Sequence, residues 1–191
     1  MMRKVAIIRG MGLNKTDMQT YEPLRKYFDI TAYHSSIAKK DIGLIELKKK
    51  KLRALEGIFG TRLSKIVEQP FRIVLLRHYM IGLENELKNF DIAHIVETYH
   101  GFCYQAARAK ERHGIKLVAT VWEDKPFFVE DRWIFRHNLR HRIKEKVRKS
   151  VDLFAAVTQR AKETLMYEGV DEDRIVVIPP GIDINKFKPR Q

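Results

Sequence analysis

The sequence predicts an α/β fold, a doubly wound and mostly parallel sheet with helices on both faces. Short runs of β-branched and other apolar residues alternate with longer amphipathic stretches, the order from which parallel sheets are built. The short runs show no strict alternation of apolar and polar residues, as expected for strands that are buried on both faces. With 191 residues, of which 45% are hydrophobic, the chain can bury the core of one such domain.

Each element follows from a local pattern. Six apolar runs predict the strands, which we place at residues 4–8, 30–34, 91–96, 116–121, 153–157 and 174–178. Amphipathic stretches between them predict helices at residues 17–28, 102–113, 131–150 and 159–168. Thr16 or Asp17 should cap the first helix, and Gly114 and Gly169 should end the second and the fourth.

The stretch 41–89 has the weakest pattern. Its mixture of basic and apolar residues predicts two or three helices, with breaks near residues 57–60 and at Pro70. An edge strand at residues 71–76 is the alternative.

The charge of the chain is strongly basic and unevenly distributed. Lys and Arg number 37 against 24 acidic residues, which gives a net charge of +13. Residues 39–77 hold 11 bases and four acids, and residues 132–149 hold eight bases and one acid. Such patches attract an anionic membrane, a phosphorylated substrate or a nucleic acid, and a lysine-rich solvated surface is the alternative. We expect no nucleic-acid partner, because the sequence contains no RNA- or DNA-binding motif.

The second basic segment is patterned as a helix face. Three arginines recur every four residues, namely Arg132, Arg136 and Arg140. Beside them runs an apolar stripe of Phe135, Leu139, Ile143 and Val147. We expect the stripe to pack on the sheet and the arginines to contact an acidic membrane surface or the phosphate of a lipid-linked acceptor. A solvated helix face is the alternative.

Cysteine content and hydropathy indicate the compartment. Cys103 is the only cysteine, which excludes an intrachain disulfide and a cysteine-rich zinc site. No apolar run approaches the roughly 18 residues of a membrane-spanning helix. Residues 5–8 form a run shorter than the roughly 7 to 15 apolar residues of a secretory signal. We therefore expect a cytoplasmic protein, held by its basic segments on the inner face of the membrane if those segments bind lipid.

Ligands of doubly wound folds bind beyond the carboxyl ends of the strands. Gly10 and Gly12 follow the first predicted strand, where backbone N–H groups can approach a phosphate; an ordinary turn is the alternative. Glu97, Tyr99 and His100 follow the third strand. A carboxylate and an imidazole at that point can bind sugar hydroxyls or transfer protons, so Glu97 and His100 are the candidate catalytic residues. A capped, solvated turn is again the alternative.

Trp122, Glu123 and Asp124 follow the fourth predicted strand. An indole face stacks on a sugar ring and neighbouring carboxylates accept hydroxyl protons, although three adjacent side chains cannot all point inward. We expect no metal site here, because no histidine or further acid lies at ligand spacing. His94, in the middle of a strand, and Cys103, one turn into a helix, are expected to be core residues.

Four stretches in order along the chain carry a resemblance to a known family. They are DIAH at 91–94, GIKLVAT at 114–120, VDLFAAVT at 151–158 and IVVIPPGID at 175–183, the last followed by Phe187 and Pro189. This arrangement resembles the N-terminal domain of the family 4 glycosyltransferases, retaining enzymes with the two-domain GT-B fold. The resemblance is good over residues 91–189, loose over residues 1–34 and weak over residues 39–90.

The resemblance implies a division of labour between two domains. Residues 1–180 would be the Rossmann-like, acceptor-side domain, and residues 181–191 the start of an interdomain linker. Pro180, Gly181 and Asp183, at this junction, would lie near the donor. A nucleotide-sugar-binding C-terminal domain, in cis or in trans, would supply the donor site, so this chain alone should be inactive. The acceptor would be a glycan or a lipid-linked molecule, the nucleotide-sugar a co-substrate, and neither a metal nor another cofactor is expected.

The sequence departs from the family pattern at several loop positions. The first loop has Gly10-Met11-Gly12 without adjacent glycines, Thr158 stands where serine is usual, and Pro180 where asparagine is usual. Trp122 replaces a common histidine, which leaves no histidine to act at that position. A non-catalytic basic α/β module that binds an anionic membrane or nucleic acid is the alternative function.

Overall fold

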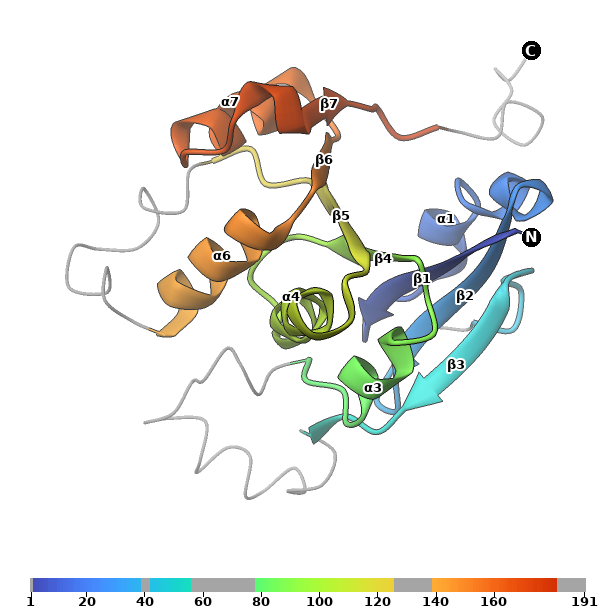
Figure 1. Ribbon diagram of the computed structural model, residues 1–191. Helices are drawn as coiled ribbons and strands as arrows, with labels where there is room; N and C mark the ends of the chain where they lie inside the picture. The colour runs from blue at the N-terminus through green and yellow to red at the C-terminus, as the bar shows by residue number, and fades with distance from the viewer. Residues whose placement is uncertain (1, 39–41, 56–77, 126–138, 182–191) are drawn as a thin grey trace, which may run out of the picture.

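The computed structural model describes residues 2–38, 42–55, 78–125 and 139–181. In this part of the chain, seven parallel strands form one sheet in the order β3-β2-β1-β4-β5-β6-β7 (Figure 1). Their bounds are β1 Arg3–Gly10, β2 Phe28–Ser35, β3 Lys48–Leu52, β4 Ile92–Val96, β5 Lys116–Val121, β6 Leu153–Ala156 and β7 Ile175–Val177. The predicted parallel, doubly wound sheet is confirmed, and all six predicted strands are present.

The helices cover the sheet unequally. Those that the structure describes are α1 Lys15–Met18, α3 Leu83–Leu87, α4 Gly101–His113, α6 Leu139–Ser150 and α7 Gln159–Tyr167, with short 3-10 helices η1 Glu22–Lys26 and η4 Glu172–Arg174. The chain winds from β1 outward to β3 and then from β4 outward to β7, so right-handed crossovers place α1 on one face and α3, α4, α6 and α7 on the other. Figure 1 shows α3, α4 and α6 side by side along that second face.

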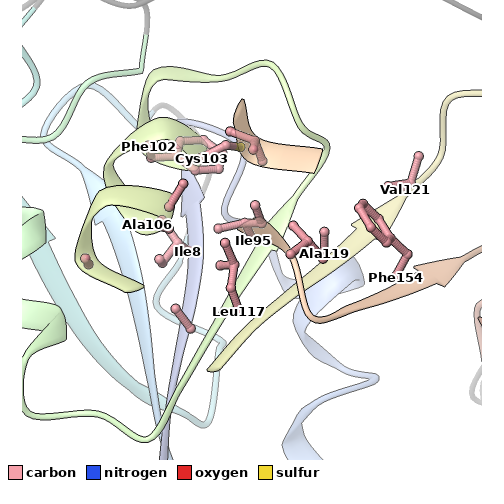
Figure 2. Close-up of a cluster of buried hydrophobic side chains, with 14 of the residues drawn as sticks. Ile8, Ile95, Phe102, Cys103, Ala106, Leu117, Ala119, Val121 and Phe154 are labelled. Atoms are coloured by element: carbon pink, nitrogen blue, oxygen red, sulfur yellow. The ribbon is translucent and has the colours of Figure 1, made fainter. Parts of the chain in front are cut away.

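Two hydrophobic clusters result from this arrangement. The larger one joins α4 to the four strands β1, β4, β5 and β6, and Figure 2 shows Phe102, Cys103 and Ala106 of α4 above strand residues such as Ile95 and Leu117. The smaller cluster lies under α1 and includes Ile7, Leu13, Met18, Ile30, Ala32, Ile45 and Leu47. Cys103 is fully buried, as predicted, and its burial raises the pKa of the thiol well above its ordinary value.

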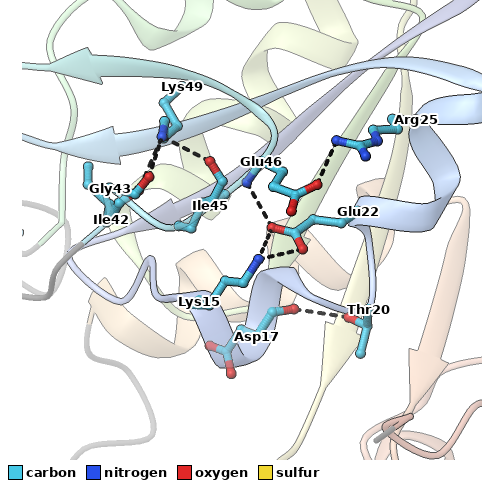
Figure 3. Close-up of polar contacts among 10 residues, drawn as sticks. All are labelled: Lys15, Asp17, Thr20, Glu22, Arg25, Ile42, Gly43, Ile45, Glu46 and Lys49. Carbon is cyan, nitrogen blue, oxygen red and sulfur yellow. Dashed lines mark hydrogen bonds and ion pairs between the residues drawn. The ribbon is translucent and has the colours of Figure 1, made fainter. Parts of the chain in front are cut away.

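Strand β3 contradicts the prediction of helices throughout residues 41–89. Four consecutive lysines, Lys48–Lys51, begin this edge strand, which pairs with β2. Lys48 and Lys50 form ion pairs of 2.6 Å with Asp29 and Glu86. Lys49 Nζ donates to the carbonyls of residues 42, 43 and 45 (Figure 3). An edge strand leaves long charged side chains in water and thereby discourages pairing with another chain, which explains why a lysine run is stable here. The breaks predicted at residues 57–60 and Pro70, and the alternative strand at 71–76, lie outside the described residues.

The helix predicted at residues 17–28 is wrong in length and in its cap. The segment forms the single turn α1 and then η1, whose first turn contains Pro23. Neither Thr16 nor Asp17 is the N-cap; Asn14 is, because its side chain accepts a hydrogen bond from the Asp17 N–H at 3.0 Å. Lys15, paired with Glu22 at 2.6 Å, fixes the two short helices to each other (Figure 3).

The later helices follow the sequence pattern closely. Gly114 ends α4 with φ +69°, Thr158 caps α7, and Gly169 follows α7 with φ +85°. The described part of the basic helix, α6, buries Ile143 and Val147 of the predicted stripe. It also buries Lys144, which the pattern does not predict.

Candidate functional site

The topological switch point of the sheet lies between β1 and β4. The chain leaves the carboxyl end of β1 toward β2 and the carboxyl end of β4 toward β5, so the two connections diverge at the point where doubly wound folds generally bind their ligands. Gly10 ends β1, Glu97 directly follows β4 and Trp122 directly follows β5. The predicted loops after β1, β4 and β5 therefore meet at one edge of the sheet.

Gly10 is required by the backbone at this edge. It has φ +55° and follows a bulge in the pairing of β1 with β2. A Cβ at this position would lie 3.0 Å from the Phe102 ring and 3.6 Å from Nδ1 of His78. Gly12 is different: it is exposed, and its N–H donates to the Arg9 carbonyl at 2.9 Å in an ordinary turn. The helix behind this loop is one turn long and already capped by Asn14, so it offers little dipole to a phosphate.

Glu97 is the most perturbed carboxyl group of the site. The residue has φ +60° and is only 8% exposed. Its Oε1 accepts a 2.9 Å hydrogen bond from the Trp122 N–H, whereas Oε2 is buried and has no partner among the described residues. The pKa of Glu97 is raised to about 7, chiefly by burial and also by the charge of Glu123, while the Trp122 N–H, Lys144 and Arg9 oppose the rise. A carboxyl group with this pKa can accept or donate a proton near neutral pH.

Buried polar atoms without a partner gather at the same edge. In the described ranges they include Arg9 Nε near the end of β1, Ser35 Oγ at the end of β2, and Glu97 Oε2 and Thr98 Oγ1 just after β4. Buried polar groups are almost always hydrogen-bonded in folded proteins, because leaving one unsatisfied costs about 1 to 3 kcal/mol. Their concentration at the ends of three neighbouring strands indicates a place for a polar ligand.

Four aromatic rings contact one another in a group, two of which, Phe102 and His78, lie beside Gly10. The rings of His78 and His100 meet edge to face with centroids 4.6 Å apart, and Tyr99 and Phe102 lie 4.5 and 5.1 Å from His100. His100 is the N-cap residue of α4, so its ring is placed at the start of that helix. His78, with φ +65°, was not predicted, because it lies within the stretch 41–89, whose sequence pattern is weak.

Arg9 is a second residue that the sequence did not reveal. Its guanidinium pairs with Asp17, and its charge helps to lower the pKa of His94. Burial is the larger cause and brings the pKa of His94 to about 4. The His94 ring contacts Thr120 Oγ1 at 2.8 Å and meets the Tyr21 ring edge to face. His94 is thus a satisfied core histidine, as expected.

The residues after β5 point in different directions. Trp122 is 48% exposed, which leaves an indole face for a ligand. Glu123 instead directs its carboxylate to Nζ of the buried Lys144, and Asp124 is exposed. Glu123 is therefore committed to an ion pair within the protein, whereas Trp122 and Glu97 face each other through a backbone hydrogen bond.

Other predicted positions are described only in part. Pro180 and Gly181 are exposed, and Asp183, Arg132 and Arg136 lie outside the described residues. Arg140 is the second residue of α6, and nothing further is described of its side chain. The basic face of this helix and the linker thus remain predictions.

A hollow of about 530 Å³ lies at the opposite edge of the sheet, near the amino ends of β1 and β2. Charged residues on its rim are already paired: Arg25 with Glu46 at 2.8 Å and Lys48 with Asp29 at 2.6 Å (Figure 3 shows the first pair). We place the site at the carboxyl edge, because the unsatisfied buried atoms and the topological switch point coincide there and not at this hollow.

Within the described ranges, no group of three or more His, Cys, Asp and Glu side chains is placed to hold a metal ion. The helices of those ranges include none with the length and hydropathy to span a bilayer.

The fold is that of a Rossmann-like α/β domain, and the comparisons place it among GT-B folds. The model of Glycosyltransferase Family 4 matches residues 46–186. The chain belongs to this family and corresponds to its N-terminal domain. A comparison with curated protein sequences gives no match.

Solved structures with the same fold include glycosyltransferases and epimerases. Anabaena Alr3699/HepE in complex with UDP and glucose aligns with TM-score 0.66 and 14% identity, over 98% of this chain and 47% of that one. The lipopolysaccharide outer core galactosyltransferase WaaB aligns with TM-score 0.57 and 18% identity, over 95% of this chain and 46% of that one. A UDP-N-acetylglucosamine 2-epimerase from Listeria monocytogenes aligns with TM-score 0.61 and 16% identity, over 93% of this chain and 44% of that one. The chain spans less than half the length of these proteins.

Proposed function

We propose that residues 1–180 are the acceptor-side domain of a retaining glycosyltransferase, which transfers a sugar from a nucleotide-sugar to an acceptor hydroxyl. The family match supports glycosyl transfer. The observation that supports the acceptor role is the cluster of unsatisfied buried atoms at the carboxyl edge, Arg9 Nε, Ser35 Oγ, Glu97 Oε2 and Thr98 Oγ1. This mixture of donors and acceptors suits the hydroxyl groups of a sugar or a lipid-linked glycan.

Each side chain at this edge has a role in the proposal. Glu97 Oε2 accepts the hydrogen bond of the attacking hydroxyl and orients its oxygen toward the anomeric carbon. Trp122 offers its half-exposed indole to the apolar face of the acceptor sugar. His100 and Tyr99 border the entrance from the start of α4. Gly10 lets the Phe102 ring pack against the end of β1, because a Cβ at this position would lie 3.0 Å from that ring.

The donor belongs to a second domain in this proposal. A C-terminal nucleotide-sugar-binding domain, in cis or in trans, holds the donor and stabilises the leaving diphosphate. The acceptor oxygen bonds to the anomeric carbon and passes its proton to Glu97 Oε2 as the bond to the diphosphate oxygen breaks, with retention of configuration. UDP-sugars are the first donors to test, because the HepE structure is a complex with UDP and glucose. The reaction is proposed to need no bound metal.

The basic segments suggest where the enzyme works. We propose that it is cytoplasmic and that residues 39–77 and 132–149 hold it on the anionic inner face of a membrane, close to a lipid-linked acceptor. The alternative, a basic module without catalytic function, is disfavoured by the family match.

The proposal is tested with the chain and its donor domain together. UDP-sugars are supplied with glycan and lipid-linked acceptors, and the anomeric configuration of the product is read by NMR. We expect a product with the anomeric configuration of the donor. An inverted product would contradict the retaining mechanism, and hydrolysis or epimerisation of the donor without transfer would contradict the acceptor role.

A further inference from the structure

Lys144 of α6 is a charged residue in a buried position. Its side chain is 1% exposed, and its Nζ contacts carboxylates from two other parts of the chain. One is Glu123, in the segment after β5; the other is Glu168 at the end of α7, at 3.0 Å. Arg148, one turn further along α6, contacts the second oxygen of Glu168 at 2.8 Å.

These four side chains form a largely buried network, in which two cations face two carboxylates. A buried ion pair seldom stabilises a fold more than apolar side chains of the same size would, whereas it fixes the relative position of the groups that it joins. The network therefore constrains geometry, and the part of the site that it constrains is the segment of Glu123.

A short path leads from Lys144 to the candidate catalytic carboxyl group. Glu123, held by Lys144, is the neighbour of Trp122 in the chain, and the Trp122 N–H donates to Glu97 Oε1 at 2.9 Å. The network also acts through its charge: Lys144 lowers the pKa of Glu97 and Glu123 raises it.

We propose that Lys144 is a positioning residue of the acceptor site. Through Glu123 it holds the Trp122 segment, so that the Trp122 N–H stays on Glu97 and the indole stays at the carboxyl edge. Its relevance to catalysis rests on the proposed function, in which Glu97 orients the acceptor hydroxyl.

The first test is an NMR titration of the full chain with ¹³C-labelled glutamate carboxyl groups. The Glu97 signal is assigned by its loss in Glu97→Gln. Lys144→Met removes a charge that favours the carboxylate, so the Glu97 midpoint should rise by about half a pH unit or more. Glu123→Gln releases the Trp122 N–H, which favours the carboxylate of Glu97 more than the Glu123 charge opposes it, so the midpoint should rise in this variant too, by a smaller amount. Lys149→Met, at an exposed position of the same helix, should leave it unchanged.

A role confined to general packing gives a different result. Both Lys144→Met and Glu123→Gln would then loosen the segment, admit water to Glu97 and lower its midpoint together. A fall of the Glu97 midpoint in both variants would overturn the proposal. A Glu97 midpoint that is unchanged in both variants would overturn it as well.

A second measurement covers the case in which Lys144→Met does not fold. Glu123→Gln leaves Lys144 paired with Glu168, so this variant should fold. Its Trp122 amide should exchange with solvent at least about tenfold faster, because the hydrogen bond to Glu97 is no longer held in place. The amide of Leu117 in β5, which donates to the Asp152 carboxylate, should keep its rate. Equal rates for Trp122 in both proteins, or equal acceleration of both amides, would refute the positioning role.

These readouts do not depend on sugar transfer, so the two ideas can fail separately. If Glu97→Gln leaves transfer intact while the titrations behave as expected, the proposed function fails and the network stands. If Glu97 is needed for transfer and its midpoint ignores Lys144 and Glu123, only the positioning role fails.

Discussion

The backbone N–H of Trp122 donates a 2.9 Å hydrogen bond to Oε1 of Glu97, which joins the first residue after β5 to the first residue after β4. This bond links the carboxyl ends of the neighbouring strands β4 and β5, next to the switch point between β1 and β4. It occupies one carboxyl oxygen of Glu97 and leaves the other, Oε2, buried without a partner among the described residues. The arrangement fixes Glu97 in place and leaves one of its carboxyl oxygens without a protein partner among the described residues.

The raised pKa of Glu97 predicts how stability depends on pH. Burial raises it from 4.5 to about 7, so the folded state binds a proton more tightly than the unfolded state. The free energy of unfolding should therefore fall as pH rises from about 4.5 to 7, by about 3 kcal/mol in total from this group. Glu97→Gln should remove this loss and be more stable than the wild type at pH 8, with nearly equal stability at pH 4.5. Urea unfolding across this range measures it.

The matched control for this prediction is Glu111→Gln. Glu111 is half exposed and pairs with Lys146 at the surface, so its replacement should change stability by less than about 1 kcal/mol at any pH. If Glu97→Gln follows the pH profile of this control, Glu97 is not a buried group with a raised pKa.

The lowered pKa of His94 predicts that the free energy of unfolding changes with pH in the opposite direction. Its pKa falls from 6.5 to about 4, mainly through burial, so the unfolded state binds the proton more tightly. Its contribution to stability should be complete above about pH 6.5 and lost as pH falls toward 4. Because this window overlaps that of Glu97, the measurement uses Glu97→Gln as background. In the Glu97→Gln background, the free energy of unfolding should still rise between pH 4 and 6.5. Adding His94→Gln should make this rise smaller. A rise of unchanged size would show that His94 does not cause it.

Gly10 and Gly12 should respond differently to the same substitution. Gly10→Ala places a Cβ 3.0 Å from the Phe102 ring at φ +55°, so it should cost about 1 to 3 kcal/mol of unfolding free energy. Gly12→Ala meets only the Arg9 carbonyl at 3.4 Å and should cost less than about 1 kcal/mol. Denaturant unfolding of both variants provides the comparison. Equal costs would show that the end of β1 does not require glycine.

The basic segments predict salt-dependent binding to anionic vesicles. Each base near such a surface contributes about 1 kcal/mol, an effect screened within roughly 8 Å at physiological salt. Arg136→Glu with Arg140→Glu should weaken co-sedimentation with phosphatidylserine vesicles more than Lys162→Glu, a reversal on α7. Equal binding to neutral and anionic vesicles would contradict the membrane role.

The sequence predicts most of the sheet and only part of the site. Apolar runs locate six strands because burial on both faces leaves a clear composition, whereas β3 is an edge strand of lysines whose stability comes from Asp29, Glu86 and loop carbonyls. Glu97 and Trp122 are predictable because they follow strands. The burial of Lys144 is not, because the partners that neutralise it, Glu123 and Glu168, come from distant parts of the chain. Arg9 and His78 likewise reach the site only through tertiary packing.

The most direct test of the account is the rate of sugar transfer by the chain with its donor domain in three forms: wild type, Glu97→Gln and Glu111→Gln. We expect Glu97→Gln to lower kcat/KM for the acceptor by about 100-fold, the size of effect associated with a positioned proton-transfer group, while Glu111→Gln stays within about twofold of the wild type. Transfer by Glu97→Gln at the wild-type rate, in a folded protein, would contradict the claim that the carboxyl edge of this domain orients the acceptor.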